Sequence, residues 1–428
     1  MLSLVALVLA GPVGAHAAPG LLVGVHEDQI KWRTQPNPIL PAVRALGLDA
    51  MRVTLRWRPG RRNLSVRTHH ELRRMVAANR YGVRIVLGVY GRAEDAPDTA
   101  SAREDYCRFV RNILLRYSEI RDVVIWNEAN SPAFWLPAVH GAPDAYAALL
   151  ARCWDLLHST VPGVNVVTTT AAGHDPIGFL GAVAAAYGAS GRTRPLFDTV
   201  GHNPYPLYSD EAPEATHHVY VGQGDHARLL SALDVSFAGT PQPPTSIWYL
   251  ENGFQTAMPS WRRSLYAGQE SVTGAVSGAR QAEQLAAALQ LAYCQPRVTA
   301  YFNFLLVDEP SLDRWQSGLL WADWTRKPSF AAYRASIGDV RAGNVTCDGG
   351  TGRPATPPEE LRWRRTKRYA PENGCARLGG SRMRSTTSAV QPVWCIAPRP
   401  APLSPWKYTL NRRLSRHAGS DWSRSVPP

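Results

Sequence analysis

The chain has 428 residues, and 45% of them are hydrophobic, so it is long enough for one large barrel or for two or three smaller domains. Its formal net charge of +13 raises the question of a nucleic-acid partner, but this charge is unevenly distributed. Residues 341–428 hold 16 Lys and Arg against 5 Asp and Glu, which leaves 31 against 29 for residues 1–340. Because the body of the chain is close to neutral, its composition excludes a basic nucleic-acid-binding domain there.

Residues 1–18 have the pattern of a secretory signal peptide. An apolar run over residues 2–10 is followed by Gly11-Pro12 and by Ala15-His16-Ala17, whose small residues are typical of a cleavage site. The alternative interpretation is a buried first helix. The run is too short to cross a bilayer, and no other apolar stretch is long enough. We therefore expect a secreted, extracellular protein without membrane insertion.

Strand-like runs alternate with helical patterns from residue 20 to about residue 340. Apolar residues spaced three and four apart predict helices, for example over 103–115 and 281–291. The expected strands are 21–25, 50–57, 83–89, 123–126, 164–169, 197–201, 247–250 and 298–304. Eight strand–helix units predict an α/β fold, the (β/α)8 TIM barrel, as a catalytic domain over residues 20–340. The alternative is an open doubly wound sheet, but no G-x-G-x-x-G follows the first strand.

Two segments depart from this alternation. Residues 205–244 are rich in Pro, Gly and Asp and are expected to form an elaborated loop and helix between the sixth and seventh strands. Residues 341–428 are rich in Arg, Pro and Ser and show little apolar periodicity, which predicts a disordered basic C-terminal tail.

The six cysteines, an even number in a chain expected to be exported, are typical of disulfide bonds. Cys107 and Cys153 lie in consecutive helical segments, and Cys294 and Cys347 bracket the last strand and helix, so each pair is a candidate. Buried free thiols are the alternative. No two cysteines have the close spacing of a zinc or redox site.

Two glutamates directly follow apolar runs that are expected to be buried strands. Glu128 follows residues 122–126, and Glu251 follows residues 246–250. A buried carboxylate is costly unless it is partnered or takes part in chemistry, and catalytic groups of such barrels lie at the C-terminal ends of the strands. Two carboxylates at the ends of strands four and seven predict the pair that cleaves a glycosidic bond.

These motifs resemble those of the clan A glycoside hydrolases, the 4/7 superfamily, in the style of its bacterial cellulase-like and β-xylosidase-like members. In that clan an Asn-Glu pair ends strand four and a second Glu, commonly within T-E-x-G, ends strand seven. Asn127-Glu128 matches the first motif, and L-E-N-G at residues 250–253 matches the second with Leu in place of Thr. The resemblance implies a retaining hydrolase of β-linked glycosides, with Glu128 as acid/base, Glu251 as nucleophile and no cofactor.

Two further side chains are expected to support this pair. Asn127 is a neutral donor suited to the sugar 2-hydroxyl, a contact that strengthens at the oxocarbenium-like transition state. Arg52, on the second strand, is the cation that we expect to keep the nucleophile ionised. The alternative for Arg52 is a place at the bottom of the barrel or on the surface.

The sixth strand departs from the clan's pattern, in which a His, one residue and a Tyr follow one another. Here Gly201-His202-Asn203-Pro204-Tyr205 contains one extra residue. The resemblance implies that Tyr205 bonds the nucleophile, while either His202 or Asn203 takes the place of the clan's histidine. At the end of strand eight, the expected aromatic residue is Phe302 or Phe304.

Aromatic rings near the strand ends are candidates for stacking on sugar, because pyranose C–H surfaces pack on aromatic faces. We prefer Trp135, seven residues after Glu128, and Trp321, in a segment similar to the clan's closing segment before its last helix. Further candidates, for which simple packing is the alternative, are Trp57, Tyr90 and Trp315.

Other chemistries find little support in the sequence. It contains no H-E-x-x-H, C-x-x-C or G-x-S-x-G, so we expect neither a metal site nor a serine hydrolase. His26, after the first strand, is expected to contact substrate or lie in the core. We expect a monomer whose partner is an oligo- or polysaccharide. The alternatives are a non-catalytic carbohydrate-binding barrel and a transglycosylase that uses the same two glutamates.

Overall fold

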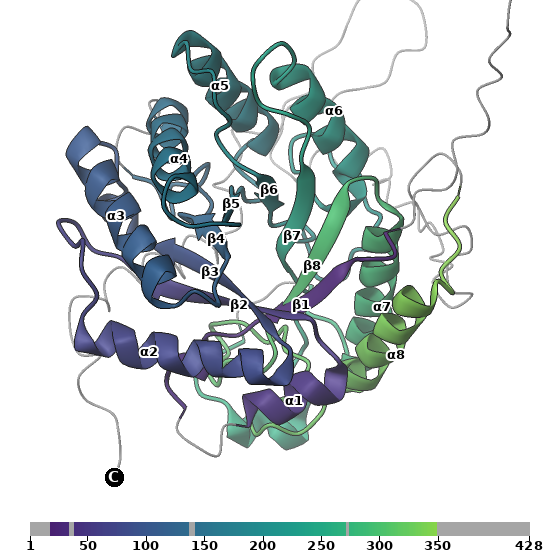
Figure 1. Ribbon diagram of the computed structural model, residues 1–428. Helices are drawn as coiled ribbons and strands as arrows, with labels where there is room; N and C mark the ends of the chain where they lie inside the picture. Colours follow the sequence, from purple (N-terminus) through teal and green to yellow (C-terminus); the bar gives the residue numbers. More distant parts are fainter. Residues whose placement is uncertain (1–17, 34–37, 137–141, 271–273, 349–428) are drawn as a thin grey trace, which may run out of the picture. The chain divides into compact units, whose positions relative to one another are not determined.

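The structure, a computed structural model, describes residues 18–33, 38–136, 142–270 and 274–348. These residues form a closed barrel of eight parallel strands with the helices arranged around it (Figure 1). This architecture confirms the expected (β/α)8 barrel. Residues 1–17 of the expected signal peptide lie outside the described residues, as does the expected tail from residue 349 onward.

Each strand pairs with the next along the chain, and β8 pairs with β1 to close the ring. The strands are β1 (Leu22–His26), β2 (Ala50–Arg56), β3 (Arg84–Tyr90), β4 (Asp122–Ile125), β5 (Asn165–Val167), β6 (Thr199–His202), β7 (Ser246–Asn252) and β8 (Val298–Phe304). The α-helices are α1 (Ile39–Leu46), α2 (Val66–Val76), α3 (Ala100–Arg116), α4 (Ala142–His158), α5 (Pro176–Ala189), α6 (His226–Ser236), α7 (Gly278–Cys294) and α8 (Pro328–Ala342). The 3-10 helices are η1 (Asp28–Lys31), η2 (Ala77–Tyr81), η3 (Ala93–Asp95), η5 (Gln223–Asp225) and η6 (Ser260–Leu265).

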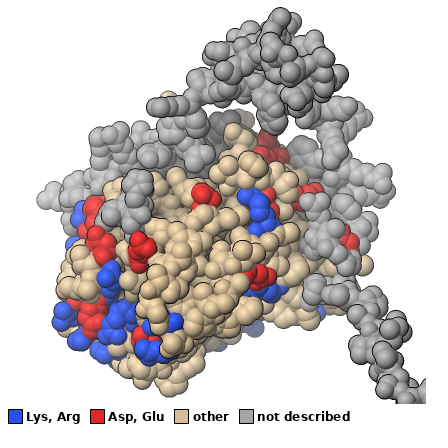
Figure 2. Space-filling model, turned by 90° about the horizontal axis from the view of Figure 1, so that it is seen from above, with Lys and Arg blue, Asp and Glu red and all other residues tan. Residues whose placement is uncertain are grey.

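Local sequence fixes where several helices begin and end. Ser65, Thr99 and Ser277 precede α2, α3 and α7, and each side-chain oxygen accepts a hydrogen bond from a backbone N–H in the first turn. Helices α1 and α8 end at Gly47 and Gly343, whose φ angles of 73° and 70° suit glycine. Acidic and basic side chains lie close together on the face shown in Figure 2, as the near-neutral body of the chain predicts.

Side chains fill the interior of the barrel, so the barrel is not a pore. The interior cluster consists of Ala50, Val86, Val124, Val167, Trp248, Leu250, Ala300 and Phe302. Glycines make room for the largest of them, because a Cβ on Gly24 would lie 2.5 Å from Phe302 and one on Gly201 would clash with Leu250. A ligand is therefore confined to the rim of the barrel, where polar side chains replace this packing.

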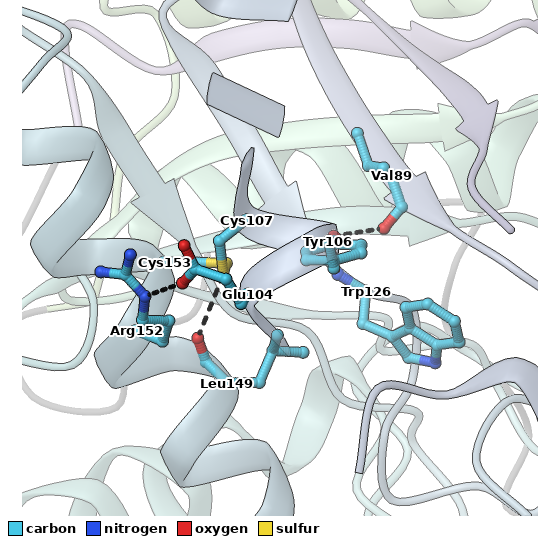
Figure 3. Close-up of a disulfide and its surroundings, with 8 residues drawn as sticks. All are labelled: Val89, Glu104, Tyr106, Cys107, Trp126, Leu149, Arg152 and Cys153. Atoms are coloured by element: carbon cyan, nitrogen blue, oxygen red, sulfur yellow. Dashed lines mark hydrogen bonds and ion pairs between the residues drawn. A yellow bond between two sulfur atoms is a disulfide. The ribbon is translucent and has the colours of Figure 1, made fainter. Parts of the chain in front are cut away.

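Both expected cysteine pairs are confirmed as disulfides. Cys107–Cys153 joins α3 to α4 (Figure 3), and Cys294–Cys347 joins the end of α7 to the segment after α8. Each bridge closes a loop of about fifty residues, with sequence separations of 46 and 53. Their presence indicates folding in an oxidising compartment. No helix among the described residues is long and apolar enough to cross a bilayer.

Two buried tyrosines on the outer helices form hydrogen bonds to backbone groups at the ends of the strands. Tyr106 of α3 donates its hydroxyl to the Val89 carbonyl at 2.6 Å and accepts from the Trp126 N–H at 3.0 Å, as Figure 3 shows. Tyr146 of α4 bridges the end of β4 and the segment after β5 in the same way, between the Ile125 carbonyl and the Thr169 N–H. These bonds satisfy buried backbone groups and fix the exit of β4.

Candidate active site

Glu128 lies beyond the end of β4 on a backbone held away from its preferred conformation. Trp126 and Glu128 have φ angles of 66° and 38°, in the left-handed region that costs about 1–3 kcal/mol for residues other than glycine. Packing compensates this cost, because the Trp126 ring is buried against Trp57 and its indole N–H donates to the Phe134 carbonyl at 2.8 Å. These two left-handed residues interrupt the alternation of side chains between the two faces of a strand. Asn127 and Glu128 therefore both reach polar partners at the rim of the barrel.

A bulge directs Glu251 into the barrel from β7. Between Tyr249 and Asn252, β7 advances three residues while its partner β8 advances two. Leu250 fills the barrel interior, yet the next side chain, Glu251, also reaches the polar cluster at the rim, whereas Asn252 donates to Gln223 instead. The extra residue re-aims the carboxylate, as bulges near functional sites commonly do.

Arg52 of β2 is the centre of the site. Its buried guanidinium donates through Nη1 to Glu251 Oε1 and through Nη2 to Asn127 Oδ1 at 2.9 Å. Nη1 also lies 2.6 Å from Nδ1 of His26, at the end of β1. Because arginine only donates hydrogen bonds, Nδ1 of His26 accepts and the imidazole is neutral. Burial, together with the Arg52 charge, lowers the pKa of His26 to about 4.

Side chains that follow β6 contact both glutamates. Tyr205 donates its hydroxyl to Glu251 Oε2 at 2.8 Å, and Asn203 donates from Nδ2 to Glu128 Oε1 at 2.9 Å. Burial, and then the charge of Glu251, raises the pKa of Tyr205 well above its usual value, so the phenol stays protonated and donates. The charge of Glu128 raises the pKa of the same phenol further.

His202 is placed away from the two glutamates. Its ring is buried, with Nδ1 2.9 Å from Thr170 Oγ1 and Nε2 2.9 Å from the Val221 carbonyl, so both nitrogens are engaged outside the site. Of the two alternatives that the sequence left for the clan's histidine, the structure brings Asn203 to Glu128.

The two tryptophans preferred from the sequence are buried. Trp135 is 1% exposed and packs between Trp126 and Tyr146, and Trp321 is 5% exposed within a small cluster under the loop after β7. The structure brings neither ring to the glutamates.

Other aromatic rings do line the rim beside Glu251. Phe304 and Trp315 are partly exposed and pack against Tyr205, with ring centroids 6.0 and 5.2 Å from it. Phe304 also lies edge-on to His26 at 4.8 Å, whereas Phe302 belongs to the barrel interior. The site therefore combines two carboxylates, one cation, neutral donors and an aromatic wall.

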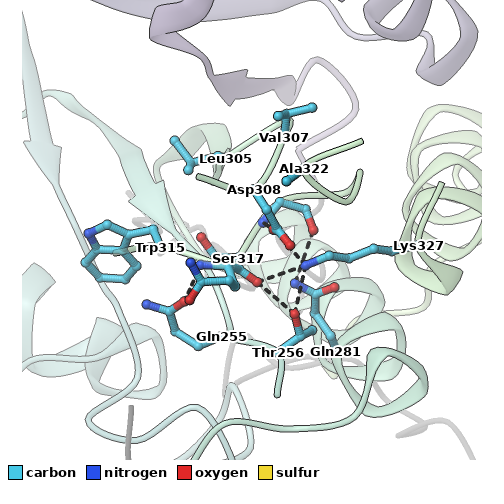
Figure 4. A network of polar contacts seen from close by, with 12 residues as sticks. Gln255, Thr256, Gln281, Leu305, Val307, Asp308, Trp315, Ser317, Ala322 and Lys327 are labelled. Atoms are coloured by element: carbon cyan, nitrogen blue, oxygen red, sulfur yellow. Dashed lines mark hydrogen bonds and ion pairs between the residues drawn. The ribbon is translucent and has the colours of Figure 1, made fainter. Parts of the chain in front are cut away.

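A buried polar network supports the loops on this side (Figure 4). Lys327, at the start of α8, donates to Asp308 Oδ1 at 2.7 Å, to Thr256 Oγ1 at 2.8 Å and to the Gln316 carbonyl at 2.9 Å. Tyr266 donates to the other carboxylate oxygen of Asp308 at 2.8 Å. These bonds join the loops after β7 and β8, including the segment that carries Trp315. Among the described residues, no group of three or more His, Cys, Asp or Glu is placed to hold a metal.

No protein-family model and no curated protein matches the chain. Among solved structures, it is similar to a family 39 glycoside hydrolase from Bacteroides cellulosilyticus WH2, with 17% identity and a TM-score of 0.55 over 75% of this chain and 64% of that one. It is also similar to the beta-glucosidase from Thermotoga maritima, with 13% identity and a TM-score of 0.51 over 74% and 97% of the two chains. A third similar structure is GH5_18 from Streptomyces cattleya in complex with Manb1-4GlcNAc, with 16% identity and a TM-score of 0.53 over 75% and 81%.

The matched region spans less than two thirds of the first of these proteins. At such identities the likeness concerns the fold, and it confirms the expected structural resemblance to barrel glycoside hydrolases. A shared fold does not fix the activity, which depends on the side chains at the rim of the barrel.

Proposed function

We propose that the protein is a secreted, retaining glycoside hydrolase that cleaves β-linked glycosides by double displacement, with Glu128 as acid/base and Glu251 as nucleophile. The observation that carries the proposal is the unequal environment of the two buried carboxylates. Glu251 accepts hydrogen bonds from the Arg52 guanidinium and the Tyr205 phenol, whereas the Glu128 carboxylate accepts one from the neutral amide of Asn203. A pair of carboxylates in contrasting environments is suited to one ionised and one protonated role.

In the first step, Glu251 attacks the anomeric carbon while Glu128 donates its proton to the departing glycosidic oxygen. In the second step, Glu128 removes a proton from water, and this water attacks the anomeric carbon and releases Glu251. Arg52 and Tyr205 each bind one oxygen of Glu251, so they orient the carboxylate before attack. Asn127, whose side-chain oxygen accepts from Arg52, binds the 2-hydroxyl in this mechanism.

The aromatic wall supplies the apolar side of the pocket in this proposal. Trp315 and Phe304 pack on Tyr205, which itself bonds the nucleophile, so a sugar attacked by Glu251 meets their partly exposed rings. Trp315 thus takes the stacking role that the sequence gave to Trp135 and Trp321. Both of these are enclosed by packing.

A panel of aryl β-glycosides and plant and microbial polysaccharides tests the proposal, with the wild type beside Glu128→Gln and Glu251→Gln. Glu119→Gln is the matched control, because this glutamate is exposed in the loop before β4. We expect release of aryl alcohol or reducing sugar by the wild type and the control, and a loss of at least a thousandfold in Glu251→Gln. Saccharide binding without turnover by any of the proteins would contradict the proposal and support a binding barrel.

A further inference from the structure

Exposed aromatic side chains are concentrated at the end of the barrel that carries the two glutamates. Within the described part of the chain, four aromatic residues are classed as exposed: Trp32, Tyr81, Tyr208 and Trp261. Trp32, Tyr208 and Trp261 lie in the loops that follow β1, β6 and β7, and Tyr81 lies at the opposite end, just before β3. The loops that follow the strands form the face on which barrel enzymes bind their substrates.

Trp261, in η6 of the loop after β7, is the most exposed of the four, at 71%. Its ring nevertheless contacts the side chain of the next residue, Arg262. The Arg262 guanidinium lies 4.3 Å from the Trp261 centroid and 5.0 Å from the Trp321 centroid, and it donates to Asp323 at 2.8 Å. Cation–π contacts of this kind fix the orientation of an indole without covering most of its surface.

This support continues into the interior of the protein. Lys327 lies 4.7 Å from the Trp321 centroid and forms the fully buried ion pair with Asp308 that Figure 4 shows. A chain of contacts therefore runs from Lys327 through Trp321 and Arg262 to Trp261. A ring restrained by such contacts loses less conformational freedom when a ligand packs on it.

We propose that Trp261 binds a sugar unit of a β-linked polysaccharide at a distance from the bond that is cleaved, so that the substrate is a polymer and not a short glycoside. This inference rests on the proposed function. The exposed indole offers the flat apolar surface that a pyranose C–H face fits, and Arg262 and Asp323 beside it offer partners for hydroxyl groups. Glu251 is the penultimate residue of β7, and the loop that carries Trp261 follows this strand, so a chain bound at the glutamates can extend over it.

Affinity electrophoresis in gels containing soluble β-glucan, xylan, mannan or galactan tests this directly. The Glu251→Gln variant serves as the parent, so that the polymer is not consumed, and it is compared with the same protein carrying Trp261→Ala or Tyr81→Ala. We expect at least one polysaccharide to retard the parent, and Trp261→Ala to weaken this binding five- to thirtyfold. Tyr81→Ala should bind like the parent, because its ring lies at the other end of the barrel. Equal retardation of all three proteins would overturn the inference.

A second comparison separates sugar binding from a structural role. In the otherwise wild-type enzyme, Trp261→Ala should lower kcat/KM on the retarding polysaccharide at least fivefold more than on an aryl glycoside, and Trp261→Phe should restore part of the loss. Equal losses on both substrates would overturn the inference. The two proposals also fail separately. If aryl glycosides are hydrolysed but no polysaccharide retards the protein, only the proposed sugar-binding role of Trp261 is contradicted. If polymer binding requires Trp261 but no substrate is ever cleaved, only the proposed hydrolase activity is contradicted.

Discussion

Arg52 and Glu251, separated by 199 residues in sequence, are joined by a hydrogen-bonded ion pair inside the barrel. The same guanidinium also contacts His26 and Asn127, so one buried cation from β2 links the ends of β1, β4 and β7. Because a buried arginine stays charged, it needs an anion beside it, and Glu251 provides that anion. In our account this pairing holds the Glu251 carboxylate in the orientation for attack.

Tyr205→Phe should reduce catalysis without unfolding the protein. The substitution removes the hydroxyl that donates to Glu251 Oε2 and keeps the ring that packs against Phe304 and Trp315. Hydrogen bonds to a charged group contribute about 1.5–3 kcal/mol, which corresponds to a loss of about 10- to 150-fold in kcat/KM. Steady-state kinetics on the best aryl glycoside measure this loss, and thermal unfolding serves as the control. Unchanged kcat/KM would show that this bond does not support the nucleophile.

Buried histidines make the stability of the fold depend on pH. Burial lowers the pKa of His26, His202 and His226 from 6.5 to about 4. Between these values the unfolded chain binds protons that the folded protein excludes, so the free energy of unfolding rises with pH in this range. Each histidine contributes up to about 3 kcal/mol, which is present above pH 6.5 and lost as the pH falls toward 4.

His202→Gln isolates one of these contributions. Glu27 acts in the opposite sense, because burial raises its pKa to about 8 and the folded protein keeps its proton where the unfolded chain loses it. Comparison of the variant with the wild type cancels this effect. Urea unfolding between pH 4 and pH 7 should show a shallower dependence on pH for His202→Gln. Parallel curves for the two proteins would contradict the assignment of a neutral, buried His202.

The disulfide between α3 and α4 should stabilise the fold more than it affects catalysis. Cross-links that close loops of this length stabilise by about 4 kcal/mol in the loop-entropy model, and by less where the reduced state retains structure. The double substitution Cys107→Ser with Cys153→Ser should lower the free energy of unfolding by about 2–4 kcal/mol in denaturant titrations. Reducing agent should destabilise the wild type by more than this, because it opens Cys294–Cys347 as well as Cys107–Cys153. Wild-type stability that reducing agent leaves unchanged would contradict both bridges.

The buried Asp308–Lys327 pair should behave as a unit. Lys327→Met leaves the Asp308 carboxylate buried without its cation, which costs about 3–5 kcal/mol. Adding Asp308→Asn removes the stranded charge, so the double variant should be more stable than Lys327→Met alone. Chemical unfolding of the wild type, both single variants and the double variant measures the coupling. Strictly additive losses would mean that the pair does not stabilise the loops that carry Trp315 and Trp261.

Strong periodic signals made the fold predictable from the sequence. Apolar runs of strand length alternate with amphipathic helices, and all eight expected strands occur in the barrel. The positions of Asn127 and Tyr205 near Glu251 follow from the same logic, because residues at the C-terminal ends of parallel strands converge on one rim. Arg52 lies earlier in its strand, and its long side chain reaches Glu251 and Asn127.

What the sequence did not predict depends on local backbone geometry. The order His202-Asn203 does not show which side chain faces inward once β6 ends, and the structure resolves this through the hydrogen bonds of each residue. Trp135 and Trp321 follow strands in sequence, but the irregular loops that carry them bury both rings against other side chains. Exposure of an aromatic ring depends on such tertiary contacts, and periodicity carries no information about them.

Covalent trapping tests the central claim most directly. The wild type would be incubated with the 2-deoxy-2-fluoro derivative of its best aryl glycoside, which slows both steps but slows release of the sugar from the enzyme most. Intact-mass and peptide mass spectrometry would then locate the label. Our account predicts one fluoroglycosyl group per protein, attached to Glu251, and none on Glu251→Gln. Turnover of the parent glycoside with inversion at the anomeric carbon, or a label on a different residue, would contradict it.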